Sequence, residues 1–143
     1  MLVRLPAYAV NRTKRLIKAP KLFWGDSGIA LHLAGAEPQG CHLDNRVLQN
    51  LLAWRDAHVE RAELGYWPNI LGEEVDLVIE AGGRQLPIEV KATASPRLDD
   101  CAHLRSFRAE YGSQACSGLL VHIGTSVEWL TDDGLAAPWW RGL

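Results

Sequence analysis

The chain has 143 residues, of which 48% are hydrophobic and 22% are charged. This length and composition are typical of one globular domain that folds without disulfides, and they exclude a disordered, collagen-like or coiled-coil protein. The formal net charge is −2, but residues 1–25, the basic segment, carry six basic and no acidic side chains. The rest of the chain carries 9 basic and 17 acidic ones, so it is a poor electrostatic match for nucleic acid by itself.

The sequence shows no sign of membrane insertion or export. No run of about 18 apolar residues predicts a membrane-spanning helix, and the N-terminus lacks the apolar stretch of a signal peptide. The cysteines Cys41, Cys101 and Cys116 form no CxxC pair and have no metal-site spacing. We therefore expect reduced thiols in a cytoplasmic protein without a membrane partner.

Two helices are predicted in the first half of the chain. Residues 1–22 are expected to be irregular or a hairpin, and a short helix over residues 29–34 follows, with Asp26 or Ser27 as its N-cap. The clearest helix is predicted over residues 43–59, because apolar side chains recur there at helical spacing. Those apolar positions are Leu43, Val47, Leu48, Leu51 and Leu52.

The second half of the chain predicts mainly strands. These elements are strands over residues 62–67, 74–80 and 85–92, a helix over 97–111, and strands over 118–123 and 127–130. Their order predicts an α/β domain on one mixed sheet. Trp24, Trp67 and Trp129 are expected in the core, and Trp139 and Trp140 in a tail that covers a core edge.

The predicted hairpin over residues 74–92 carries the strongest chemical signal. Glu89 and Lys91 share one face because side chains alternate along a strand, and the turn at Gly82 and Gly83 brings Asp76 close to Glu89. Facing carboxylates repel, so a bound cation is the natural compensation, and oxygen ligands suit Mg²⁺ or Mn²⁺. The alternative is an ordinary cross-strand or surface ion pair, since acid-x-lysine is a common pattern.

Three further features have two interpretations each. Asp44 lies in the middle of the apolar face of the helix over 43–59, so it either points onto the sheet or serves as a favourable acid in the first helical turn. His122, in an apolar strand, is expected to be a hydrogen-bonded core residue rather than a metal ligand. The basic segment either contacts nucleic acid or is a solvated arm. The residues expected to contact nucleic acid are Arg12, Lys14, Arg15, Lys18 and Lys21.

Four segments in the right order carry a family resemblance over nearly the whole chain. They are NRTKRLIKAPKLFWGDSGIALHLAG, LDNRVLQNLLAW, EVDLVIEAGGRQLPIEVKA and LRSFRAEYG. An acid on the first helix, Asp on the second strand and ExK on the third resemble the PD-(D/E)xK superfamily. More closely, the segments resemble the domain of unknown function 4143, the C-terminal nuclease-like domain of prokaryotic AAA+ ATPases.

The resemblance implies a restriction-endonuclease-like mixed sheet flanked by helices, with the core order α-β-β-β-α-β. It implies that Asp76, Glu89 and Lys91 are catalytic, and that Asp44, Asp76, Glu89 and the carbonyl of Val90 hold the metal. Residues 1–22 resemble the end of an upstream winged-helix segment, and residues 23–143 resemble the nuclease-like domain.

Two functions follow as expectations. The first is hydrolysis of DNA phosphodiester bonds that depends on Mg²⁺ or Mn²⁺, in association with an AAA+ ATPase module in cis or in trans. The alternative is a non-catalytic module that docks an ATPase, forms an oligomer or binds DNA through the basic segment.

Overall fold

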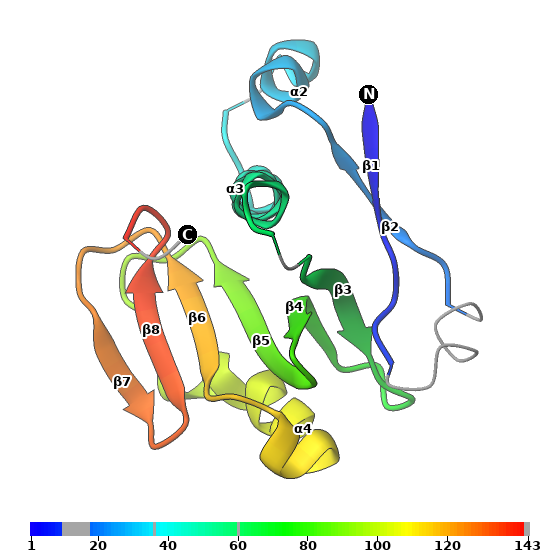
Figure 1. Cartoon of the computed structure of the whole chain (residues 1–143). Coiled ribbons are helices and arrows are strands. Elements are labelled where there is room, and N and C mark those ends of the chain that lie inside the picture. The colour runs from blue at the N-terminus through cyan, green and yellow to red at the C-terminus, as the bar shows by residue number, and fades with distance from the viewer. Residues whose placement is uncertain (10–17, 36, 60, 142–143) are drawn as a thin grey trace.

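The computed structural model describes residues 1–9, 18–35, 37–59 and 61–141. It contains a two-stranded sheet and a six-stranded mixed sheet with helices on both faces (Figure 1). The two-stranded sheet pairs β1 (Leu2–Leu5) with β2 (Lys21–Trp24) in antiparallel fashion. Residues 1–22 were expected to be irregular or a hairpin, and the antiparallel pairing agrees with the hairpin. Strand β2 extends beyond the predicted segment to Trp24.

The six-stranded sheet has the order β3-β4-β5-β6-β8-β7. Neighbouring strands are antiparallel from β3 to β5, parallel from β5 through β6 to β8, and antiparallel again between β8 and β7. The strands are β3 (Glu63–Pro68), β4 (Glu74–Ala81), β5 (Arg84–Lys91), β6 (Gly118–His122), β7 (Glu128–Thr131) and β8 (Gly134–Pro138). Gly82 and Gly83 form the β4–β5 turn with φ of 57° and 75°, a conformation that glycine adopts at little cost.

The helices begin and end at recognisable local signals. In α2 (Ser27–Ala34), the Asp26 side chain accepts a hydrogen bond from the Ile29 amide, as expected of an N-cap. The long helix α3 (Gly40–Ala57) begins three residues earlier than predicted, and the His42 side chain caps its first turn by accepting a hydrogen bond from the Gln39 amide.

The helix predicted over residues 97–111 is divided into two parts. It begins as the 3₁₀ turn η1 (Leu98–Cys101) and continues as α4 (Ala102–Tyr111), and the short turn η2 (Gly112–Gln114) follows. No helix among the described residues is long and apolar enough to span a membrane.

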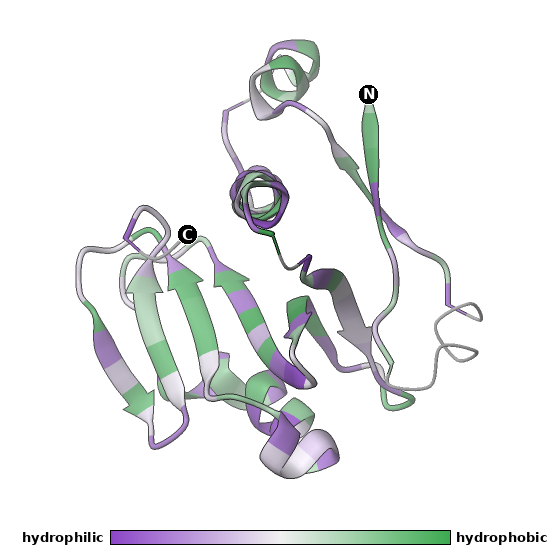
Figure 2. Cartoon of the chain, in the orientation of Figure 1, coloured by the Kyte–Doolittle hydropathy of each residue, from purple (hydrophilic) through white to green (hydrophobic). Residues whose placement is uncertain are grey.

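The core consists of two clusters on opposite faces of the six-stranded sheet. On one face, α3 packs against β4, β5 and β6 through Val47, Leu48, Leu77, Ile88 and Val121. On the other face, α4 packs through Leu104, Phe107, Val78, Leu120 and Ala136. In Figure 2, hydrophobic colour runs along β6 but alternates with hydrophilic colour in β5, the strand that carries Glu89 and Lys91. The α/β class and the predicted order α-β-β-β-α-β, from α3 to β6, are confirmed.

Strand β8 is an element that the sequence analysis missed. It lies between β6 and β7, where Ala136 is fully buried. A side chain at Gly134 would come within 2.6 Å of Thr131 Oγ1 and 3.2 Å of Cys101 Sγ, so small residues are needed here. Glycine and alanine have weak strand propensity, so the sequence of residues 134–138 does not predict a strand.

Two of the three tryptophans predicted in the core are on the surface. Trp67 is buried, but Trp24 is 45% exposed and Trp129 is 59% exposed. Trp129 lies on β7, the edge strand of the six-stranded sheet, and Trp24 lies on the two-stranded sheet. Trp139 packs partly against the core as expected of a covering residue, whereas Trp140 is exposed.

Candidate functional site

Asp76 lies where β4 and β5 stop pairing. The ladder between these strands runs from Ala81 opposite Arg84 to Leu77 opposite Ile88. The next residue, Asp76, accepts a hydrogen bond from the Val90 amide through Oδ2 at 2.9 Å. The carboxylate therefore continues the pairing of β4 with β5 through its side chain.

Glu89 lies in the middle of the sheet on β5 and is only 2% exposed. Its Oε1 accepts a hydrogen bond from Lys91 Nζ at 2.8 Å, which agrees with the prediction that the two side chains share a face. His103 Nδ1, on α4, lies 3.8 Å from the same oxygen. The other oxygen, Oε2, is buried and has no hydrogen-bond partner in the described part of the chain.

The electrostatics of Glu89 reflect its burial and its acidic neighbour. Burial raises the pKa of Glu89 to about 7, and the negative charge of Asp76 acts in the same direction, against Lys91 and His103. Burial alone would lower the pKa of Lys91, but its hydrogen bond to Glu89 and the charges of Glu89, Asp76 and Asp100 outweigh burial and raise it. The ion pair is thus held in a region of net negative charge.

The charge of Asp44 interacts with those of Asp76 and Lys91. Burial raises the pKa of Asp44 to about 6, the charge of Asp76 adds to this increase, and Lys21 and Lys91 oppose it. The first turn of α3 contains no acidic residue, because the helix begins at Gly40 and Asp44 lies beyond that turn. The interpretation of Asp44 as an acid in the first helical turn is therefore wrong, and the charge of Asp44 interacts with that of Asp76.

Lys91 also lies at the edge of a cavity of about 480 Å³. Thr93, Ser95, Arg97 and Asp100 line this cavity together with Lys91. Lys91 therefore connects the buried Glu89 with an open space whose lining carries both positive and negative side chains.

The basic residues predicted to contact nucleic acid are only partly described. Lys21 on β2 forms an ion pair with Glu74, and its Nζ lies 3.9 Å from Asp76 Oδ1. Lys18 is exposed. Arg12, Lys14 and Arg15 lie outside the described residues. Lys21 is therefore part of the carboxylate site, which the sequence did not indicate.

His122 agrees with the interpretation of a hydrogen-bonded core histidine. It is fully buried, and its Nδ1 accepts a hydrogen bond from the Gly124 amide at 2.9 Å. The proton therefore belongs on Nε2, which lies 3.1 Å from the Ser126 carbonyl oxygen. Both ring nitrogens are used, so His122 is not available to the carboxylate site.

The donor set fits a cation that keeps part of its hydration shell. Among the residues that the structure describes, no three His, Cys, Asp or Glu side chains gather closely enough to hold a metal ion. Mg²⁺, however, is commonly bound by one or two carboxylates, with water and substrate phosphate completing its shell. Asp76 and the unpartnered Oε2 of Glu89 are donors of this kind.

The architecture defines an α/β domain with a buried carboxylate site at one end of its central hairpin. Comparison with known proteins shows that the chain belongs to a family described as a domain of unknown function (DUF4143), whose model matches residues 39–141. The match runs from the beginning of α3 to beyond β8 and includes Asp44, Asp76, Glu89 and Lys91. No curated protein and no solved structure matches the chain.

Proposed function

We propose that this domain binds a divalent cation through Asp76 and Glu89 and hydrolyses phosphodiester bonds in DNA. The observation that carries the proposal is the state of Glu89: one oxygen is held by Lys91, and the other is buried without a hydrogen-bond partner among the described residues. A buried, unpaired carboxylate oxygen is costly, and a cation beside Asp76 would offset that cost.

The topology supports the same proposal. An acid on α3, Asp on β4 and Glu-x-Lys on β5 resemble the PD-(D/E)xK nucleases in both order and placement. Because a fold supports many functions, the argument for hydrolysis depends on the carboxylates and the lysine rather than on the fold.

Each residue of the site has a role in the proposed reaction. Asp76, Glu89 and the Val90 carbonyl would hold the cation, and Asp44 would add negative charge to the site. When bound, Mg²⁺ or Mn²⁺ supplies Lewis-acid stabilisation of the phosphate and makes water more acidic. Lys91, anchored by Glu89, would orient the attacking water or donate a hydrogen bond to a phosphate oxygen. Arg97 lines the cavity of about 480 Å³ that Lys91 also lines, and it would provide a second positive charge for the phosphate.

The association with an AAA+ ATPase module, in cis or in trans, is part of this proposal and comes from the resemblance of the segments. A second candidate function is a non-catalytic docking module. The observation that favours it is a set of large apolar side chains exposed on β2 and α2. They are Leu22, Trp24, Ile29 and Leu33.

Calorimetric titration with Mg²⁺ and with Mn²⁺ tests the cation site. At about pH 8, where the raised pKa of Glu89 leaves it mostly ionised, we expect the parent chain to bind either ion. Glu89→Gln and Asp76→Asn keep the side-chain shape but remove a charge, so each should weaken binding about tenfold or more. Asp132→Asn removes an exposed carboxylate from the β7–β8 turn and should bind like the parent. If the parent binds neither ion, the docking function replaces the proposal.

Cleavage of supercoiled and linear DNA in the presence of Mn²⁺ tests the chemistry. We expect Lys91→Ala to lower the rate by about 100-fold or more while cation binding persists, because the lysine acts on water or phosphate rather than on the cation. Activity that survives in Lys91→Ala and Glu89→Gln would reveal a contaminating nuclease and contradict the proposed mechanism.

A further inference from the structure

A second cavity lies beside the C-terminal half of α3, whereas Asp44 lies near the N-terminal end of that helix. Strand β1 is joined to β3 near Tyr66, whose amide donates to the Pro6 carbonyl at 3.0 Å and whose carbonyl accepts from the Tyr8 amide. The cavity, of about 450 Å³, lies between β1, α3 and β3, and residues of that junction line part of it. Its apolar lining includes Val3, Leu5, Leu48, Leu52 and Leu64.

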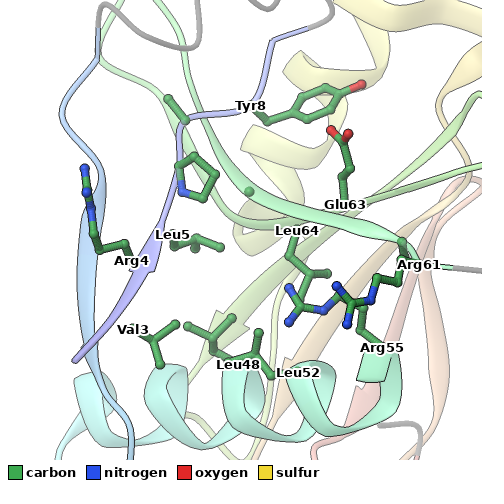
Figure 3. Close-up of a pocket in the computed structure, with 14 residues that line it drawn as sticks. Val3, Arg4, Leu5, Tyr8, Leu48, Leu52, Arg55, Arg61, Glu63 and Leu64 are labelled. Carbon is green, nitrogen blue, oxygen red and sulfur yellow. The ribbon is translucent and has the colours of Figure 1, made fainter. Parts of the chain in front are cut away.

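Two arginines line this cavity beside the apolar side chains. Arg55 comes from the last turn of α3, and Arg61 precedes β3. In the view of Figure 3, Arg55 and Arg61 extend toward the part of the lining that holds Leu64, whereas the Arg4 side chain extends away from them and Glu63 points toward Tyr8. Asp56 partly neutralises Arg55, whereas Arg61 has no carboxylate partner among the described residues, so an anion in the cavity would supply the missing negative charge.

The hydrogen-bonding capacity of the pair is largely unused. Arg55 contacts Oδ1 of Asp56 through Nε and Nη2, each at 2.9 Å, which leaves the Nη1 donors available. Arg61 has no hydrogen-bond or ion-pair partner among the residues that the structure describes. Guanidinium groups match the planar oxygen pairs of carboxylates and phosphates, so this pair suits such an anion.

We propose that this cavity is a binding site for a small amphipathic anion, namely a carboxylate or phosphate monoester attached to an aliphatic chain. The arginine pair binds the anionic group, and Val3 and Leu52, the lining side chains that remain partly exposed, contact the aliphatic part. The volume lies within the usual range for small-molecule sites, roughly 300–1,000 Å³. The site is distinct from the carboxylate site, because Arg55 follows Asp44 on α3 by eleven residues, or about 16 Å along the axis. The inference therefore does not depend on nuclease activity.

Titration of the full chain with simple amphiphiles tests this site. The probes are sodium octanoate, octyl phosphate, 1-octanol and inorganic phosphate, followed by calorimetry and by amide chemical shifts. We expect octanoate, octyl phosphate or both to bind with one-to-one stoichiometry and to shift the amides of Leu5, Leu64 and Arg61. Octanol lacks the anionic group and inorganic phosphate lacks the aliphatic chain, so each should bind at least about tenfold more weakly. Tighter binding of octanoate identifies a carboxylate ligand, and tighter binding of octyl phosphate identifies a phosphate ester.

A chain-length series and charge variants complete the test. Affinity should rise about fourfold for each methylene added from butanoate to octanoate, because each buried methylene contributes about 0.8 kcal/mol. Arg55→Gln and Arg61→Gln should each weaken binding about tenfold. Arg84→Gln, which replaces an exposed arginine at the start of β5, should leave binding unchanged.

The proposal is overturned if neither octanoate nor octyl phosphate binds saturably. It is also overturned if Arg55→Gln and Arg61→Gln bind as tightly as Arg84→Gln does, or if the shifted amides lie around Ile29 and Leu33 instead. Circular dichroism of each variant confirms that a loss of binding comes from the missing guanidinium group and not from unfolding.

Discussion

Glu89 shows how a single buried side chain links stability to pH. The folded chain raises the pKa of Glu89 from 4.5 to about 7, because burial and the charge of Asp76 disfavour its ionised form. Between these two pKa values, the folded state binds more protons than the unfolded state. The contribution of Glu89 to the free energy of unfolding is therefore greatest at low pH and falls as the pH rises through about 7.

Comparison of the parent with Glu89→Gln tests this dependence without added metal. The variant keeps an oxygen for Lys91 but cannot ionise, so the parent should lose stability relative to the variant by roughly 1–3 kcal/mol between about pH 5 and pH 8. Urea unfolding followed by circular dichroism at several pH values measures the difference. A difference that stays constant with pH would show that Glu89 titrates normally in the folded chain.

At the scale of elements, a small polar network attaches β2 and α2 to α3. Asn45 is buried on α3; its Oδ1 accepts from the Trp24 amide at 2.8 Å, and its Nδ2 donates to Ser27 Oγ at 2.9 Å. Gln49 extends the network to Ser27 and to the Trp24 carbonyl. These bonds join segments more than fifteen residues apart and fix the two-stranded sheet beside the helix that carries Asp44.

Asn45→Ala should loosen this attachment. We expect a loss of about 2 kcal/mol in the free energy of unfolding, because the Trp24 amide loses its only side-chain acceptor in the described structure. Hydrogen exchange should speed up at Trp24 and in α2 before it does in β5. Asn50→Ala, a half-buried control on the same helix, should change stability by less than about 0.5 kcal/mol. Equal exchange in both variants would contradict the assigned role.

At the scale of the whole molecule, the six-stranded sheet separates two apolar clusters that must form together. Leu48 belongs to the cluster under α3, and Phe107 to the cluster under α4. Strands β4 and β6 contribute side chains to both clusters, since successive side chains point to opposite faces. Loss of packing on either face therefore weakens the same strands.

Leu48→Ala and Phe107→Ala should each lower the free energy of unfolding by about 2–5 kcal/mol, the usual range for a large cavity in a core. Each variant should still unfold in one transition, with tryptophan fluorescence and far-ultraviolet circular dichroism giving the same midpoint. Separate midpoints in either variant would show that the two faces unfold independently.

The sequence by itself determined the order of helices and strands from α3 to β6, the Gly82-Gly83 turn and the shared face of Glu89 and Lys91. These features follow from local rules, namely helical periodicity, strand alternation and the freedom of glycine at positive φ. The nearness of Asp76 to β5 also follows, because a tight turn fixes which residues of a hairpin meet.

Only the tertiary structure decided the features that depend on distant segments. It inserted β8 between β6 and β7, left Trp24 and Trp129 exposed, and brought Asp44 close enough for the charge of Asp76 to raise its pKa. It also joined Lys21 to the carboxylate site and brought Arg55 and Arg61 to one cavity. These outcomes depend on packing between elements that are far apart in sequence. The periodicity of one segment specifies which of its faces is apolar, but not which partner covers that face or which charges meet across it.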